Sequence, residues 1–121
     1  MTNLRRIRLE LARTPEYPDG NREHGYEFVA PLNRDDHIDP EAWKKLRDAC
    51  WVSRFSGEDT ETGVLRHVGK GWRFDYHAKT RDDDEPFFKL DRHPLKPGAY
   101  VSITEHDGVQ RPFKVISVTP A

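Results

Sequence analysis

The sequence predicts one small, mainly β domain, an antiparallel barrel or strongly bent sheet of about seven strands with a single short helix near residues 40–49. Three observations predict it. Apolar and polar residues alternate in several short segments, as they do in strands with one buried face. Turn residues separate most of these segments, and only one segment has the spacing of an amphipathic helix. At 121 residues the chain has the size of one domain, so residues 1–121 form a single folding unit.

The first two predicted strands lie in the N-terminal part of the chain. Alternating Ile and Leu side chains predict a half-buried strand over residues 5–13. Tyr26 and Phe28 begin a second alternating segment, which ends at Pro31. The connection between them, residues 14–25, contains two prolines and an Asp-Gly pair and is long for a hairpin loop. Loops of this length often carry function, and a disordered surface excursion is an equally good interpretation.

The predicted helix begins after Asp39, a favourable N-cap residue. Pro40 follows at the first helical position, where its missing N–H costs nothing. Trp43 and Leu46 share one face, and charged residues cover the rest. The helix therefore packs by one apolar stripe, and a third strand begins at Trp51.

The next predicted hairpin turns at residues 69–70 and has one largely aromatic face. This register places Leu65 opposite Phe74. It also places Gly63 opposite Tyr76. The other face is mixed and mostly polar, and it contains Thr62, Val64, Arg66, Arg73, Asp75 and His77.

The last predicted hairpin turns through three residues, 106–108, with Gly108 in the left-handed conformation. This register pairs Val101 with Phe113, whereas a two-residue turn would scatter the apolar side chains over both faces. A short strand over residues 87–90 lies between the two hairpins and completes the predicted sheet.

Composition and charge restrict the location and the partners. The chain has 20 Lys and Arg against 21 Asp and Glu, a balance without the basic excess of a general nucleic-acid binder. It has no apolar segment typical of a signal peptide or a membrane span. The single cysteine allows no internal disulfide, in agreement with a reducing compartment. We expect a cytoplasmic protein that makes no membrane contact.

No spacing in the sequence matches a known catalytic or metal-binding motif. Cys50 ends the predicted helix beside Trp51, which is typical of a buried structural thiol. The chain contains neither a Gly-x-Ser-x-Gly motif nor a phosphate-binding loop. The six histidines lack the spacing of helical zinc ligands and are scattered at His24, His37, His67, His77, His93 and His106. We expect no catalytic residue, no metal and no cofactor.

Two acidic segments are interpreted as structural. Asp35 and Asp36 precede the helix, where carboxylates interact favourably with the positive end of the helix dipole. Residues 82–85 lack the ligand spacing and the central glycine of a calcium-binding loop. Both segments are therefore expected to be solvated rather than ligand-binding.

Three segments carry a resemblance to other proteins. They are residues 5–11, Arg-Arg-Ile-Arg-Leu-Glu-Leu, residues 24–28, His-Gly-Tyr-Glu-Phe, and residues 96–103, Lys-Pro-Gly-Ala-Tyr-Val-Ser-Ile. Together they resemble a family of small bacterial proteins of similar length. The resemblance implies a stand-alone bacterial domain and no particular activity.

The function expected from the sequence is non-enzymatic binding, by a binding or accessory protein that uses the polar face of the 69–70 hairpin. A protein or small-molecule partner is favoured over nucleic acid because it requires no charge excess. Two alternatives stay open: an enzyme whose histidines and carboxylates converge only in the fold, near residues 14–25, and a single-stranded nucleic-acid binding module. The expected contact residues are Arg66, Arg73, Asp75 and His77.

Overall fold

The computed structural model describes residues 4–68, 71–76, 85–88, 94–105 and 108–121. The N-terminal half contains, in chain order, β1 (Leu4–Leu11), β2 (Asn21–Pro31), α1 (Pro40–Leu46), a 3₁₀ turn (Arg47–Ala49) and β3 (Trp51–Ser56). The C-terminal half contains β4 (Asp59–Val68), β5 (Gly71–Tyr76), β6 (Glu85–Phe88), β7 (Tyr100–Thr104) and β8 (Gln110–Pro120).

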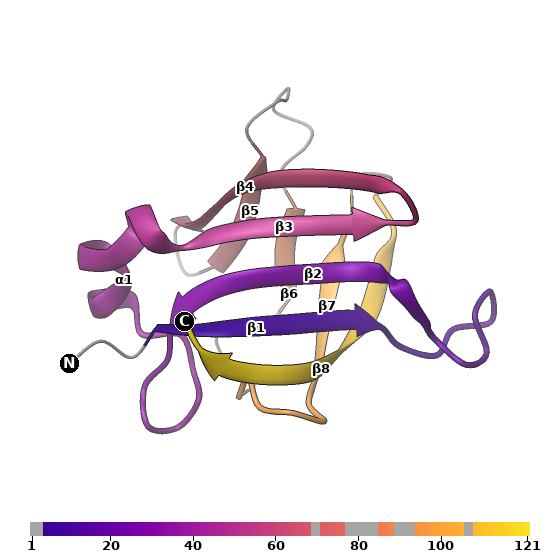
Figure 1. The fold of residues 1–121 in the computed structure, drawn as a ribbon, viewed down its shortest axis with the longest axis horizontal. Coiled ribbons are helices and arrows are strands. Elements are labelled where there is room, and N and C mark those ends of the chain that lie inside the picture. Colours follow the sequence, from indigo (N-terminus) through magenta and orange to yellow (C-terminus); the bar gives the residue numbers. More distant parts are fainter. Residues whose placement is uncertain (1–3, 69–70, 77–84, 89–93, 106–107) are drawn as a thin grey trace.

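The strands form a closed antiparallel barrel in sequence order (Figure 1). Each strand pairs with its neighbours along the chain, and β8 pairs back with β1 through residue pairs such as Leu9 with Val115. The prediction of a mainly β, antiparallel fold with one short helix is confirmed. The described part of the chain has eight strands, one more than the approximate number expected.

The two hairpin registers predicted from the sequence are confirmed. In β4–β5, Leu65 lies opposite Phe74. In β7–β8, Val101 lies opposite Phe113. Gly108 has a φ of 80°, in the left-handed region, as predicted for the last residue of the three-residue loop. The alternation of apolar residues and the turn residues therefore specify the same register, as expected where one face of each strand is buried.

The helical segment spans residues 40–49 as predicted, with α1 over Pro40–Leu46 and the 3₁₀ turn over Arg47–Ala49. Asp39 Oδ1 accepts hydrogen bonds from the N–H groups of Glu41 at 3.0 Å and Ala42 at 3.3 Å. Trp43 packs against the barrel, and its Nε1 donates to the Leu65 carbonyl oxygen at 3.1 Å. No helix in the described residues is long and apolar enough to cross a membrane.

The two ends of the barrel differ. One end, called here the α1 end, holds α1 and the C-terminus (Figure 1). The opposite end, called the loop end, holds the 12–20 connection, which projects away from the barrel, and the tight β3–β4 turn. Only the α1 end has a helix packed against it in the described part of the chain.

Aromatic rings fill the interior between these ends. The ring of Tyr26 lies 5.2 Å from that of Phe74 and 5.1 Å from that of Phe113, measured between ring centroids. These separations are typical of favourable aromatic pairs. The fully buried large side chains are Tyr26, Tyr76, Phe28, Phe74, Phe113, Ile7, Leu9, Leu65, Leu95 and Ile103.

A glycine in β4 provides a first test of this packing. Gly63 lies opposite Tyr76, and a Cβ at this position would collide with the Asp75 carbonyl oxygen and lie 2.6 Å from the Tyr76 Cα. We expect Gly63→Ala to lower the free energy of unfolding by roughly 2–3 kcal/mol, measured by urea denaturation. Gly57→Ala is the control, with an expected cost of about 1 kcal/mol. Gly57 has a φ of 62° but no atom within 4 Å of the added Cβ, so equal losses would contradict the packing argument.

Candidate functional site

The most unusual buried group is a carboxylate at the loop end of the barrel. Glu105 follows β7 directly and is 4% exposed, the one charged residue among the buried side chains of the described segments. The alternation that buries Val101 and Ile103 continues for one more step and turns Glu105 inward. Its backbone closes the β7–β8 turn, because its carbonyl accepts from Gly108 N–H at 2.8 Å.

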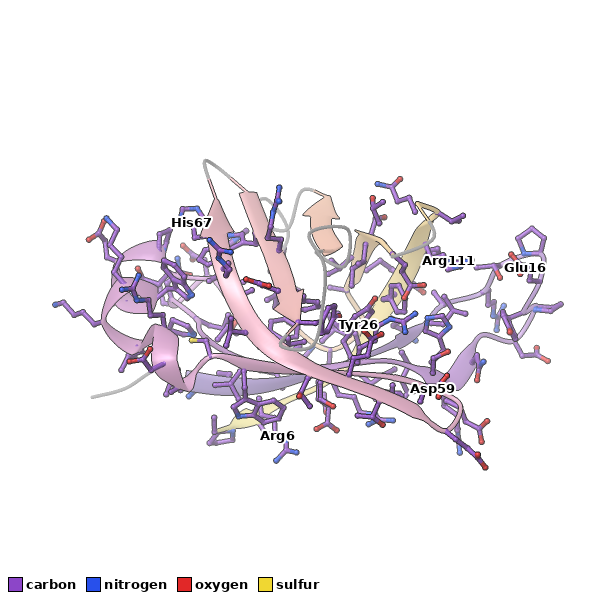
Figure 2. All side chains as sticks on the ribbon, turned by 90° about the horizontal axis from the view of Figure 1, so that it is seen from above. Arg6, Glu16, Tyr26, Asp59, His67 and Arg111 are labelled. Carbon is purple, nitrogen blue, oxygen red and sulfur yellow. The ribbon has the colours of Figure 1, made fainter. Side chains whose placement is uncertain are left out.

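Four side chains from three other strands surround this carboxylate. On Oε2, Tyr26 Oη donates at 2.6 Å, and Arg54 Nη2 donates at 3.0 Å. His24 Nε2 lies 2.9 Å from the same oxygen. On Oε1, Arg111 Nη1 donates at 3.1 Å. In Figure 2, Arg111 lies toward the loop end, far from His67 beside α1. We call Glu105, His24, Tyr26, Arg54 and Arg111 the Glu105 cluster.

The surroundings of Glu105 decide its charge. Burial of the carboxyl group raises its pKa, but the hydrogen bonds from His24 and Tyr26 and the positive charges of His24 and Arg54 outweigh burial and lower that pKa to about 2. Glu105 is therefore ionised at neutral pH. A carboxylate with so low a pKa is a poor proton donor or acceptor near pH 7, so its role is to orient its neighbours.

His24 is the neighbour whose chemistry this orientation changes most. An ionised carboxylate only accepts hydrogen bonds, so the contact places a proton on Nε2 and leaves Nδ1 as the acceptor in the neutral ring. The ring also contacts Phe113, with 5.7 Å between centroids. The side chain is 13% exposed, so His24 sits at the rim of the interior rather than within it.

A groove lies on the outer wall of the barrel, also at the loop end. Its volume is about 980 Å³. One side is formed by residues 10–13 and 19–23, from the base of the projecting loop. The other side is the outer face of β7–β8, where Tyr100 and Ile116 are exposed to 58% and 41%. Part of the loop singled out from the sequence therefore does build a pocket.

Hydrogen bonds within the projecting loop fix its shape. Thr14 and Tyr17 exchange two backbone hydrogen bonds of 3.0 Å. Gly20 N–H donates to the Tyr17 carbonyl at 2.9 Å, and its φ of 78° returns the chain to the barrel. The loop is shorter than predicted because β2 already begins at Asn21. In Figure 2, the labelled Glu16 marks the outer part of this loop.

The contact residues predicted from the sequence lie on the outer face of β4–β5. Arg66 Nη1 pairs with Asp75 Oδ2 at 2.8 Å, and Arg66 lies directly opposite Arg73. The structure thus brings these three residues together on one surface. His77, the fourth, lies outside the described residues.

Two other candidate groups, Cys50 and His67, occupy structural positions. Burial raises the pKa of the Cys50 thiol to about 11, so it is inert, as expected of a structural thiol. His67 stacks on Trp72, with 4.2 Å between ring centroids. Within the described segments, no group of three or more His, Cys, Asp or Glu is arranged to hold a metal ion. His93 and His106 lie outside those segments, as do residues 82–84 of the second acidic run.

Sequence reasoning missed the Glu105 cluster, although part of its signal was present. Glu105 lies two residues after the buried Ile103, and Arg54 lies two residues after the buried Val52. Each therefore continues the inward-facing positions of its strand. Reading these two strands one step further would have identified two inward charges of opposite sign. The sequence alone does not predict their ion pair, because Arg54 and Glu105 are 51 residues apart and come together only in the closed barrel.

Neither a family model, nor a curated protein sequence, nor a solved structure matches this chain.

The charge of Glu105 makes the stability of the protein depend on pH. Its folded-state pKa of about 2 lies below the ordinary value of 4.5, so its contribution is complete above pH 4.5 and is lost as the pH falls toward 2. This difference corresponds to roughly 3 kcal/mol. We expect Glu105→Gln to be less stable at pH 7 and to lose much of the acid dependence, measured by urea denaturation from pH 2 to pH 7.

Glu27→Gln is the matched control for this measurement. Burial raises the pKa of Glu27, and hydrogen bonds from Arg6 and Arg8 outweigh this and lower it. The Glu27 side chain is 25% exposed, so solvent weakens these interactions and the change in stability should be smaller. An unchanged acid dependence in Glu105→Gln would show that the cluster does not hold an ionised carboxylate.

Proposed function

We propose that the protein is a non-enzymatic binding protein whose ligand occupies the groove between residues 10–13 and 19–23 and the outer face of β7–β8. The observation that carries this proposal is the groove itself. Its volume of about 980 Å³ lies at the upper end of the range for small-molecule sites, and apolar and charged side chains converge on it.

The filled interior supports an outer site. An eight-stranded barrel encloses just enough space for its own side chains or for one small ligand. Here the interior contains packed rings such as Tyr26, Phe28 and Phe74, and ion-paired side chains occupy its loop end. A ligand that binds without rearranging this core must therefore bind outside the wall.

The Glu105 cluster supports binding rather than catalysis by the carboxylate. Its ionised state at neutral pH and its four partners make it a fixed structural anchor. Burying these charges costs desolvation energy, which the mutual hydrogen bonds offset. The result is a rigid loop end, which suits a preformed site on the neighbouring outer wall.

Two other charged surfaces have weaker support as binding sites. On the β4–β5 face, Arg66 already pairs with Asp75. On the β1–β3 face, Arg6 and Arg8 both pair with Glu27, so these cations are compensated rather than offered to a phosphate backbone. These ion pairs favour the groove over a protein contact at β4–β5 and over single-stranded nucleic acid.

The proposal predicts where small molecules bind. In a ¹⁵N-HSQC titration with a mixture of small fragments, we expect saturable shifts in residues 10–13 and 19–23 and at Tyr100 and Lys114. Tyr100→Ala should weaken this binding without a loss of stability, because the side chain is 58% exposed. Shifts centred on Arg66 and Arg73 instead would reject the groove and support the β4–β5 face.

An acid–base enzyme centred on His24 is the second candidate, and the 2.9 Å contact between His24 and Glu105 favours it. A carboxylate that orients an imidazole at the rim of a barrel is an arrangement used for general-base catalysis. If this reading holds, hydrolysis of p-nitrophenyl acetate should exceed the buffer rate and be lost in His24→Gln. A rate that is the same in His24→Gln and in the parent protein would eliminate this candidate.

A further inference from the structure

The charges around the groove are not balanced once existing ion pairs are counted. Glu10 is already bound by Arg8, with 2.8 Å between Nε and Oε2. Among the described residues, the remaining charged side chains of the groove form no ion pair. They are three cations, Arg13, Arg22 and Lys114, against two carboxylates, Asp19 and Glu23. The groove therefore has one uncompensated positive charge, which favours an anionic ligand.

An exposed aromatic ring lies directly beside one of these cations. Tyr100 lies opposite Lys114 in the β7–β8 register, and both side chains point outward. Tyr100 is the most exposed large apolar side chain in the described part of the chain, at 58%. Ile116, on the same face of β8, extends the apolar floor. A flat ring stacked on Tyr100 would cover this surface and bring a negative substituent to Lys114.

We propose that the ligand of the groove is a small planar aromatic molecule with an anionic group. Its ring packs on Tyr100 and Ile116, and its carboxylate or phosphate lies by Lys114. This inference rests on the proposed binding function and narrows it to one chemical class. A carboxylate and a phosphate would be recognised by the same cations, so the probes below include both.

The test is a ¹⁵N-HSQC titration of the full chain with 1-naphthoate, an aromatic carboxylate, and with 1-naphthyl phosphate, which carries a phosphate on the same ring system. We expect saturable shifts in the groove from at least one of these probes, and the tighter of the two identifies the anion. Naphthylmethanol, which has the ring without the charge, and acetate, which has the charge without the ring, should each bind more weakly by at least about threefold.

Two variants separate the roles of the ring and the charge. Tyr100→Ala should weaken the binding of naphthoate by about fivefold or more. Lys114→Gln should weaken naphthoate but leave naphthylmethanol unchanged, because only naphthoate carries a charge. Tyr17→Ala and Lys44→Gln are the controls, since both residues are exposed and lie outside the groove lining.

The outcomes distinguish this inference from the proposed function. If naphthylmethanol binds in the groove as tightly as naphthoate, the assignment of an anion is overturned while the groove remains a binding site. If fragments bind there but none of the aromatic probes does, the assignment of a ring is overturned. Equal effects of Tyr100→Ala and Tyr17→Ala would also overturn it.

Discussion

Closure of the barrel by β1 and β8 is the constraint on which the rest of the structure depends. Once β8 pairs back with β1, the described strands form a sheet without a free edge, and the side chains of the chain itself fill the interior. Among the described residues, large rings for this purpose come from Tyr26, Phe28, Phe74, Tyr76 and Phe113. Gly63 shows the limit of the space, since a single added Cβ would meet the backbone of β5.

The two ends of the closed barrel are completed by different chemistry. At the α1 end, Trp43 packs on Trp72 with 5.7 Å between ring centroids, so the core continues into the helix. At the loop end, where no helix packs among the described residues, the interior passes from aromatic rings to ion pairs around Glu105. Such pairs offer little net stability compared with apolar packing, because desolvation opposes them. They do, however, fix the geometry of three strands and one turn at the end where the groove lies.

The local structure could be predicted from the sequence, whereas the Glu105 cluster could not. Asp39 and Pro40 mark the start of the helix, and the alternation around Leu65 and Val101 sets the hairpin registers, because both signals act over a few residues. The Glu105 cluster joins side chains from β2, β3, β8 and the turn after β7, which come together only because the barrel closes. The β1–β8 pairing that closes the barrel contains a register shift between Arg8 and Leu9, which the local sequence pattern does not predict. The groove was predicted only in part. The sequence identified the loop on one side of it but not the β7–β8 face on the other side.

A single irregularity in β2 links the buried cluster to the outer groove. Glu10 pairs with Gly25, but the next residue, Leu11, pairs with Asn21, so three residues of β2 have no partner on β1. Bulges of this kind redirect side chains that regular pairing would hold on fixed faces. Of the three, Arg22 and Glu23 line the groove, whereas His24 turns inward to Glu105. The backbone that shapes the outer site is thus held from inside by the partly buried contact between His24 and Glu105, which links the two features at the same end of the barrel.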